Sequence, residues 1–393
     1  MGEPFNTPVP GATPRSQSPV SHLYIAPVTT AAHEKPIVLH IGDEVRYNMH
    51  TYDDFASKYT IVRPSVAERQ RPVFMQALRD GKWGQFSAIF RPFWGSGGEM
   101  GVWDEDLVAL LPDTCRVFAS AGAGFDWVDT RTLGKQGIVY CNTGLAAAEA
   151  VSDFAVAMVI STFRHLPWCI GAASSSDAGA FKDCHRRATA QSRNLRGHVL
   201  GIIGMGNIGQ CLAEKLGCVA FGMRIHYYDV VRKPVELEAR LHATYHSTLG
   251  GLLSTADCVV LCTPASIDGK TLINKDSLGL FKPGARFVNV ARGSLVDEEA
   301  LADALEDNQL VSAALDVHTS EPRVNPRLAK LAWLTSQEGT GVPGRVMLTC
   351  HNAGGVLETH IGFEELSMRN IMAVLDGAKP ITPVNLHYIV GGL

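Results

Sequence analysis

Short apolar runs alternate with helical stretches along most of this chain, and that alternation is the strongest constraint on its fold. A first series is KPIVLHIGD (35–43), FSAIFRP, CRVFASAG and GIVYCNTG, the last ending near residue 144. A second series begins at 198 with HVLGIIG, MRIHYYD, ADCVVLCTP, ARFVNVARG, VSAALDVH and RVMLTCHN. Strands that are apolar along their whole length and separated by helices are typical of parallel sheets covered on both faces. The pattern therefore predicts an α/β protein.

The two series predict two domains, for which a chain of 393 residues is long enough. The six runs of the second series are the number expected of a doubly wound, Rossmann-type cofactor domain, which we place at 149–351. The first series predicts a flavodoxin-like α/β substrate domain over 36–148. A helical run from Glu358 to Asp376 is expected to return to it, so this domain is discontinuous and includes 352–393. The helical stretch 149–166 is expected to connect the two.

Composition excludes several classes of partner. A net charge of −4, with 46% hydrophobic and 19% charged residues, carries no electrostatic footprint for nucleic acid. The longest apolar run, AVAMVISTF (155–163), is shorter than the roughly 18 residues of a membrane span. Residues 1–35 hold six of the 20 prolines and lack a secretory apolar region. We expect them to form a disordered leader on a cytoplasmic protein.

The nine cysteines are odd in number and have no paired metal-ligand spacing. We expect them to be small buried side chains in a reducing compartment, and we expect no metal site.

The segment GMGNIG (204–209) has the GxGxxG spacing, which means little as a bare string. Here it follows the strand VLGII and precedes the helical IGQCLAEKLG, which is the context that dinucleotide binding requires. Gly204 would allow the tight turn, Gly206 the approach of a pyrophosphate to the backbone, and Gly209 the close packing of helix on strand.

An acidic residue, Asp229, closes the next strand RIHYYD. At that position, about 20 residues after the glycines, a carboxylate accepts hydrogen bonds from the adenosine ribose. It favours NAD over NADP, because a 2′-phosphate would meet a like charge. Arg232 and Lys233 lie near enough to leave NADP open. An acidic residue in an ordinary turn is the alternative.

Four side chains that can do chemistry follow the last strands. Arg292 comes after FVNVA, Asp316 ends SAALD, Glu321 lies in SEP, and His351 follows LTC. Ligands of doubly wound sheets bind outside the carboxyl ends of the strands. Arg292 offers a bidentate fork for a carboxylate. His351 can exchange a proton near neutral pH, with Glu321 stabilising its imidazolium. This set fits hydride addition to a 2-oxo acid.

Less specific interpretations stand beside these. Arginines after strands often make surface ion pairs, and a lone histidine is more often structural than catalytic. Glu321 by itself is weak evidence for a catalytic site. A zinc or Cys-His enzyme would use Cys350 beside His351. Because adjacent strand residues point to opposite faces, we expect these two side chains not to converge on one centre.

From about 36 to 385 the sequence resembles the D-isomer-specific 2-hydroxyacid dehydrogenase family. The motifs are HVLGIIGMGNIG, FKPGARFVNVARGSLVDEEALADAL, ALDVHTSEP and the histidine followed by AGG; AGAGFDWVD (121–129) is most similar to the D-mandelate dehydrogenase subgroup. The resemblance implies that Arg292 binds the substrate carboxylate and that His351 with Glu321 is the acid and base. It implies that Asp316 lies near the nicotinamide, and that Ala123 and Gly124 offer backbone N–H groups to the carboxylate.

The resemblance also implies a homodimer formed through the cofactor domain and a cleft that closes over the substrate. We expect NADH-dependent reduction of bulky or aromatic 2-oxo acids. A dinucleotide-responsive, corepressor-like binding protein of the same fold is the alternative. The positions expected to contact the cofactor are Gly204, Met205, Gly206, Asn207, Ile208, Gly209, Asp229, Thr263, Pro264, Ala291 and Asp316.

Three departures from the family pattern concern the site. Cys350 stands where proline is common, and the loop usually written NTPGxNA reads NTGLAAA (142–148). The segment WLTSQEGTGVPGR, an expected surface loop, lengthens the connection from Glu321 to His351 to 30 residues (351 − 321). Loop closure depends only weakly on length, so the pair can still meet.

Overall fold

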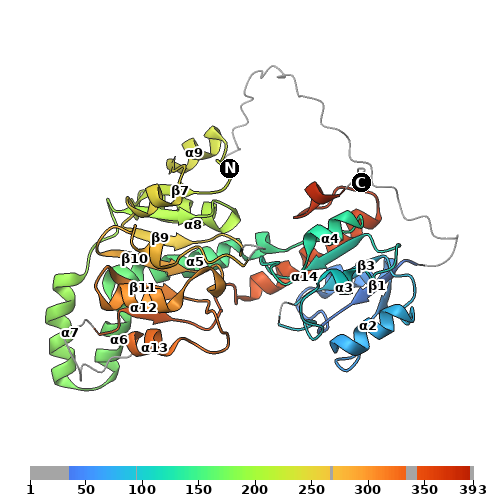
Figure 1. Ribbon diagram of the computed structural model, residues 1–393, viewed down its shortest axis with the longest axis horizontal. Helices are drawn as coiled ribbons and strands as arrows, with labels where there is room; N and C mark the ends of the chain where they lie inside the picture. Colours follow the sequence, from blue (N-terminus) through green and yellow to red (C-terminus); the bar gives the residue numbers. More distant parts are fainter. Residues whose placement is uncertain (1–34, 94, 266–268, 333–342, 390–393) are drawn as a thin grey trace, which may run out of the picture.

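The computed structural model describes residues 35–93, 95–265, 269–332 and 343–389. They form two parallel α/β domains joined through two long helices (Figure 1). The predicted leader lies outside the described residues except for Lys35, and so does most of the predicted surface loop 333–345. We name the two units the five-stranded and the seven-stranded domain after their sheets.

The five-stranded domain has the strand order β2-β1-β3-β4-β5, with every pair parallel, as the flavodoxin-like prediction required. Its strands are β1 (Ile37–His40), β2 (Thr60–Val62), β3 (Ala88–Arg91), β4 (Val117–Ser120) and β5 (Val139–Cys141). Its helices are α1 (Met49–Lys58), α2 (Arg71–Arg79), α3 (Glu105–Val108), α4 (Thr130–Lys135) and α14 (Leu357–Leu375), followed by the 3-10 turn η2 (Leu386–Tyr388).

Both faces of this sheet are covered, and the strands other than β2 are buried along almost their whole length. On one face Trp103, Phe118 and Tyr140 pack in edge-on ring contacts. On the other face Met368 and Ile371 of α14 belong to the same buried cluster as strand residues. The predicted return of the chain to the first domain after His351 is therefore present, because α14 packs on β3 and β4 and contributes to that domain's core.

The seven-stranded domain has the order β12-β11-β10-β9-β6-β7-β8, again parallel throughout. Its strands are β6 (Val199–Ile203), β7 (Arg224–Tyr228), β8 (Ala243–Tyr245), β9 (Cys258–Leu261), β10 (Ala285–Asn289), β11 (Leu310–Leu315) and β12 (Val346–Leu348). Counted from β6, this is the doubly wound order with a seventh strand added, so the predicted Rossmann-type fold is confirmed.

The helices of this domain lie on both faces of the sheet. They are α5 (Gly144–Arg164), α8 (Asn207–Gly217), α9 (Val235–Leu241), α10 (Leu249–Leu253), α11 (Lys275–Leu278), α12 (Glu298–Glu306) and α13 (Pro326–Ala332), with the 3-10 turn η1 (Gly293–Leu295). Met158 of α5 and Leu212 of α8 share one buried cluster with β6. Leu253 and Leu301 share another with Phe287 of β10.

Two strands were not expected from the sequence. β2 and β8 are three residues each and none of their residues is fully buried. Both lie at sheet edges, where one side of the strand needs no apolar partner. The apolar-run criterion therefore could not find them.

Helix α5 is long and apolar enough to cross a membrane by length and composition, with a mean hydropathy of 1.5 over its most apolar window. The sequence expectation considered uninterrupted apolar runs, which Glu149 and Asp153 break. Half of that window, 50%, is buried inside the protein, where α5 packs on α8 and on β10 and β11. This is the environment of a core helix.

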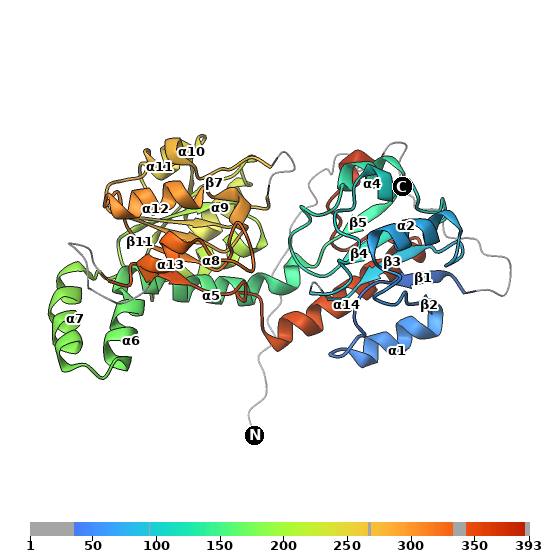
Figure 2. The ribbon, with the colours of Figure 1, turned by 60° about the horizontal axis from the view of Figure 1, so that its bottom comes forward.

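A helical hairpin that the sequence did not predict projects from the seven-stranded domain (Figure 2). It consists of α6 (Leu166–Ser174) and α7 (Ala178–Gln191). His165, in the left-handed conformation at φ 50°, turns the chain from α5 into α6. Trp168, Ala172, Cys184 and Ala188 form a small buried cluster between the two helices.

We predict that His40 makes the stability of the five-stranded domain depend on pH. His40 ends β1 fully buried, with Nε2 2.7 Å from the carbonyl oxygen of Asp43. Burial lowers its pKa from 6.5 to about 4. Between these values the unfolded chain binds more protons, so stability falls as pH drops. The expected loss from this group is roughly 2 kcal/mol between pH 7 and pH 5.

Urea unfolding of the parent and of His40→Gln at both pH values tests this. The variant is expected to lose less stability than the parent between them, and an equal loss in the two proteins would contradict the assignment.

Candidate active site

The glycine loop after β6 has the geometry that a pyrophosphate needs. Gly204 has φ 96°, and a Cβ there would lie 2.8 Å from the backbone nitrogen of Thr263. A Cβ on Gly209 would lie 2.2 Å from the carbonyl oxygen of Gly204, so helix and strand could not pack. Gly206 is exposed and faces open space within 4 Å, at the N-cap of α8. These residues fit a bound dinucleotide, with phosphate at the helix N-terminus.

Asp229 follows β7 and lies against the same loop. Its Oδ2 accepts from the backbone N–H of Met205 at 2.9 Å and lies 3.0 Å from Nζ of Lys233. The neighbouring Arg232 is held by both carboxylate oxygens of Glu238, at 3.0 and 2.8 Å. Two acids and two cations therefore border the expected ribose position, and their charges balance.

Arg292 lies just beyond β10, and buried contacts fix its backbone. The side chain of Asn289, 1% exposed, accepts from the N–H of Ala291 and donates to the carbonyl of Arg292, at 2.9 and 3.0 Å. The guanidinium reaches the five-stranded domain. Its Nε donates to Oδ1 of Asp126 at 3.1 Å, and Nη1 donates to the carbonyl of Ala291 at 2.8 Å.

Gly124 is the surface on which that guanidinium rests. A Cβ on Gly124 would lie 1.4 Å from Nη2 of Arg292. The loop that carries it is held from β5 and the residues after it, because Asn142 donates to the carbonyl of Ala123 at 2.9 Å and Thr143 accepts from Gly122 at 2.8 Å. Gly124 thus lies against the arginine, with Ala123 next to it in the same loop.

His351 and Glu321 meet although 30 residues separate them in sequence. Nδ1 of His351 lies 2.9 Å from Oε2 of Glu321, and the other carboxylate oxygen accepts from the N–H of His318 at 2.9 Å. Burial alone would raise the pKa of Glu321, but the hydrogen bonds from His351 and His318 outweigh it and lower that pKa. The carboxylate is therefore ionised at neutral pH and can stabilise an imidazolium.

Asp316 was predicted to lie near the nicotinamide, and its hydrogen bonds give it a second, structural role. It borders the cleft but is 1% exposed. Its carboxylate accepts from Oγ1 of Thr349 at 2.7 Å and from the N–H groups of Asn352 and Ala353 at 2.9 Å each. Its carbonyl accepts from the N–H of His351 at 2.7 Å. Asp316 therefore holds the segment that carries His351.

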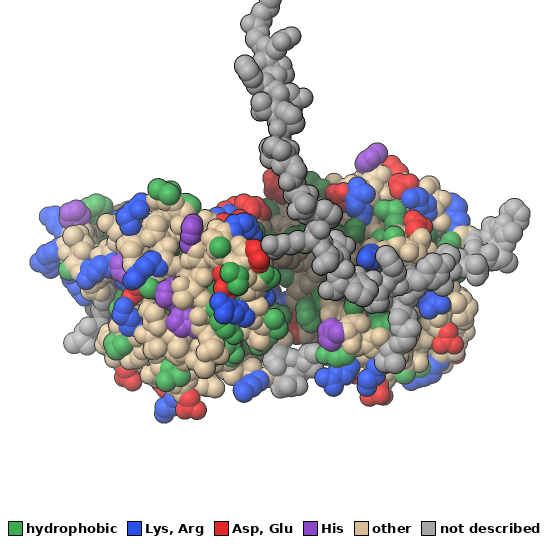
Figure 3. Space-filling view, turned by 90° about the horizontal axis from the view of Figure 1, so that it is seen from above, with side chains coloured by type: hydrophobic (Ala, Val, Ile, Leu, Met, Phe, Trp, Pro, Cys, Tyr) green, Lys and Arg blue, Asp and Glu red, His purple; other side chains and the backbone are tan. Residues whose placement is uncertain are grey.

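One cavity of about 440 Å³ between the domains brings together six of the sixteen predicted site residues, among them all of the predicted substrate-binding residues. Figure 3 shows the hollow between the two lobes from above. Among the residues lining it are Ala123, Gly124, Ile208, Arg292, Asp316 and His351. Thr263, Pro264 and Ala291 are not among the lining residues, although they follow β9 and β10 at the same sheet edge. Glu321 lines a second cavity of about 630 Å³ behind His351.

The structure adds cleft residues that sequence reasoning did not single out. Arg91, at the end of β3, lies with its guanidinium carbon 4.5 Å from the ring centre of Trp127, and both line the cavity. Asp126 and Trp127 belong to AGAGFDWVD, the motif in which Ala123 and Gly124 were predicted to bind substrate and which is similar to a subgroup of the family. That motif was the available signal. Nothing in the sequence marked Arg91 as a cleft residue, because many strands end in an arginine.

The reason given for separating Cys350 from His351 is wrong, because it assumed a continuing strand, whereas β12 ends at Leu348 and His351 has φ 53°. Both residues line the second cavity. Over the described part of the chain, no group of three or more His, Cys, Asp or Glu side chains is arranged to hold a metal ion.

The arrangement of fold and site is that of an oxidoreductase using a nicotinamide dinucleotide. A family model described as the D-isomer specific 2-hydroxyacid dehydrogenase NAD-binding domain matches residues 156–352. The chain belongs to the D-isomer-specific 2-hydroxyacid dehydrogenase family. It is therefore a dehydrogenase that acts on CH–OH donors with NAD(P).

Relatives and solved structures agree with this membership. The holo form of D-mandelate dehydrogenase from Rhodotorula graminis superposes with a TM-score of 0.81 at 34% identity, over 90% of this chain and 98% of that one. A 4-methyl-2-oxopentanoate reductase of Aspergillus oryzae is 30% identical over 89% of this chain and 98% of its own. A glyoxylate reductase of Thermococcus gammatolerans is 35% identical over 70% of this chain and 77% of its own.

We predict that Gly124→Ala displaces Arg292 and lowers kcat/KM for 2-oxo acids by about 100-fold, the loss that a misplacement of about 1 Å can cause. The new Cβ would occupy the position of Nη2, whereas the backbone of Gly124 does not need a positive φ. Steady-state kinetics and NADH titration measure the two effects, and NADH binding is expected to persist.

Gly279→Ala is the matched control, because a Cβ there meets only ordinary contacts of 3.4 Å or more. Turnover by Gly124→Ala close to that of the parent would show that the arginine does not need this surface.

Proposed function

We propose that this enzyme reduces bulky or aromatic 2-oxo acids to D-2-hydroxy acids with NADH, reversibly. The observation that carries the proposal is one cavity with Arg292 and His351 on the seven-stranded side and Trp127 on the other. A fixed cation, a proton donor and an apolar wall are what a 2-oxo acid with a large side chain requires.

Arg292 holds the substrate carboxylate in this proposal. Its Nε and Nη1 already have protein partners, so the carboxylate meets the Nη edge above Gly124. Backbone N–H groups of Ala123 and Gly124 border the same place. The guanidinium of Arg292 in this position also polarises the keto carbonyl of the substrate.

His351 transfers the proton. Because Glu321 holds Nδ1, the proton exchanged with the substrate is on Nε2. In reduction the imidazolium donates that proton to the oxygen of the former carbonyl and becomes neutral. In oxidation the neutral ring removes the proton from the hydroxyl, and Glu321 stabilises the cation that forms.

The residues that would hold the dinucleotide are those of the glycine loop, with Asp229 at the ribose. When bound, NADH supplies the hydride that adds to the carbonyl carbon. We propose NAD as the preferred cofactor because Asp229 lies beside the glycine loop, where its carboxyl group would meet a 2′-phosphate with a like charge. Lys233 and Arg232 could still turn toward a 2′-phosphate.

The walls of the cleft support a large substrate side chain. Trp127, Val102 and Phe363 line it on the five-stranded side, and the Arg91 guanidinium stacks on Trp127. The mandelate dehydrogenase and the 4-methyl-2-oxopentanoate reductase named above act on an aromatic and a branched acid. The glyoxylate reductases act on a much smaller one.

Rates of NADH and NADPH oxidation across 2-oxo acids of graded size test the proposal. Phenylpyruvate, benzoylformate and 4-methyl-2-oxopentanoate are expected to be reduced with higher kcat/KM than glyoxylate, giving the D products. Preference for glyoxylate would overturn the substrate class, and no turnover on the whole panel would overturn the function.

We predict that His351→Ala lowers kcat by roughly 10²–10⁴, the usual range for a positioned acid or base, with little change in NADH binding. Glu321→Gln should lower kcat less, because the amide still orients the ring but no longer stabilises its charge. His50→Ala, on the exposed side of α1, is the control. A His351→Ala variant with parental kcat would remove this residue from the mechanism.

We also propose that the enzyme is a homodimer in which the α6–α7 hairpin takes part. Ile170 and Phe181 are 63% and 57% exposed on a hairpin that projects from its domain (Figure 1). Light scattering on the parent and on the double variant Ile170→Asp, Phe181→Asp tests this. A dimeric parent and a monomeric variant are expected, and a monomeric parent at micromolar concentration would contradict it.

A further inference from the structure

We infer that Asp126 is a positioning residue for Arg292 and couples the placement of that arginine to the approach of the two domains. The inference rests on the proposed role of Arg292. Asp126 lies between β4 and α4 in the five-stranded domain, whereas Arg292 follows β10 in the seven-stranded domain. The 3.1 Å contact from Nε to Oδ1 therefore joins the domains at the edge of the cleft.

The contact with Asp126 determines which edge of the guanidinium is left for the substrate carboxylate. With Nε on Asp126 and Nη1 on the Ala291 carbonyl, the plane of the group is fixed against Gly124. A carboxylate needs two parallel N–H groups in that plane. Without Asp126, only the Ala291 contact orients the long side chain, which keeps several rotamers.

Exposure argues for positioning over stability. The side chains of Arg292 and Asp126 are 27% and 36% exposed, and exposed ion pairs contribute little to folding. Loss of Asp126 should therefore leave the domains folded. A carboxylate so near the bound substrate also repels it, so its presence would weaken binding if it did not orient the arginine.

Kinetics of Asp126→Ala and Asp126→Asn separate these effects. We expect Asp126→Ala to raise KM for the best 2-oxo acid by about 10- to 100-fold, with kcat changed much less. Asp126→Asn should raise it less, because the amide oxygen can still accept from Nε. Asp113→Ala, an exposed carboxylate of the same domain, is the control. An unchanged or lowered KM in Asp126→Ala would overturn the inference.

Amide hydrogen exchange gives a readout that does not need turnover. If the ion pair joins the domains, Asp126→Ala and Arg292→Ala should each speed exchange in both 122–126 and 293–296. Faster exchange only on the mutated side would overturn the coupling. If the parent reduces no 2-oxo acid, the proposed function fails, while this comparison still decides whether the pair holds the arginine.

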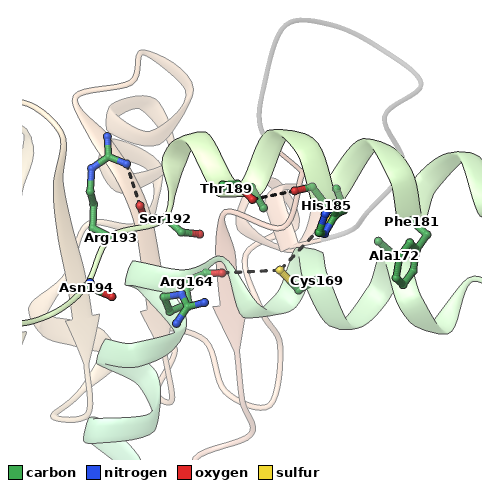
Figure 4. Close-up of a pocket in the computed structure, with 11 residues that line it drawn as sticks. Arg164, Cys169, Ala172, Phe181, His185, Thr189, Ser192, Arg193 and Asn194 are labelled. Carbon is green, nitrogen blue, oxygen red and sulfur yellow. Dashed lines mark hydrogen bonds between the residues drawn. The ribbon is translucent and has the colours of Figure 1, made fainter.

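A second inference comes from the hairpin and is independent of the cleft. Cys169 on α6 and Cys184 on α7 have their Sγ atoms 3.9 Å apart. Figure 4 shows Cys169 facing α7 beside a cavity of about 560 Å³ that is also lined by Arg164, His185 and Arg193. Cys184 is buried, whereas Cys169 is partly exposed.

We propose that Cys169 and Cys184 form an oxidisable dithiol that hydrogen peroxide converts to an intrachain disulfide. Cys169 attacks first, and its sulfur is oxidised to a sulfenic acid as the O–O bond breaks and one water is released. The Cys184 sulfur then attacks that sulfur, the S–O bond breaks, and a second water leaves. Two thiols lose two protons and two electrons, and the peroxide is reduced to two waters.

The exposure of Cys169 and the raised pKa of Cys184 determine that Cys169 reacts first. Burial and the neighbouring Cys169 raise the pKa of Cys184 to about 11, so Cys184 is poorly suited to attack peroxide directly. The sulfurs must still approach to about 2.05 Å, which a change of side-chain rotamer and a small helix shift can provide.

Peptide mass mapping after hydrogen peroxide treatment of the full chain tests this. A disulfide linking the Cys169 and Cys184 peptides, 2 Da lighter than the reduced pair, is expected in the parent and in Cys218→Ser. It should be absent from Cys169→Ser and Cys184→Ser. Because the bond closes a short loop, oxidised parent should also unfold at a higher temperature than reduced parent. Sulfinic acid on Cys169 without the crosslink, or a different disulfide, would overturn the proposal.

Discussion

The active site depends on the hydrogen bonds that the buried carboxylate of Asp316 accepts. It accepts three hydrogen bonds from Thr349, Asn352 and Ala353, while its backbone carbonyl takes the N–H of His351. His351 has φ 53°, a conformation that costs free energy in any residue with a Cβ and persists only where its surroundings enforce it. Asp316 supplies that enforcement. Burying this carboxylate is tolerable here because hydrogen-bond donors surround it. Asp316, just after the neighbouring strand β11, therefore fixes the backbone of the histidine, while Glu321 holds its ring.

Strand register then arranges the remaining groups. Asn289 of β10 pairs with Leu315 of β11, which pairs with Leu348 of β12, so the three strands end level with one another. The residues beyond these ends are Arg292, Asp316 and His351, and they meet because parallel strands share one carboxyl edge. The opposite wall comes from a different sheet, so substrate would touch two domains whose contact in this structure includes the pair of Arg292 and Asp126.

Local patterns in the sequence were sufficient for much of this site. The GxGxxG spacing predicted the tight turn at Gly204 and the close packing at Gly209, because both depend on residues that are near in sequence. The meeting of His351 with Glu321 was anticipated from their chemistry. Asp126 was not, since its partner is 166 positions away and nothing near either residue indicates the pairing. The hydrogen bonds of Asp316 to the segment after β12 were not predicted either, because they depend on how that segment folds. β2 and β8 were missed because edge strands need few apolar residues.

Helix α5 has a mechanical consequence. It starts with Ala147 and Val151 in the wall of the cleft and ends at Arg164, where the α6–α7 hairpin begins. A helix of 21 residues is a stiff rod about 30 Å long. The cleft wall and the hairpin thus lie at opposite ends of one helix. A partner bound to the hairpin would therefore contact the same stiff helix that forms part of the cleft wall.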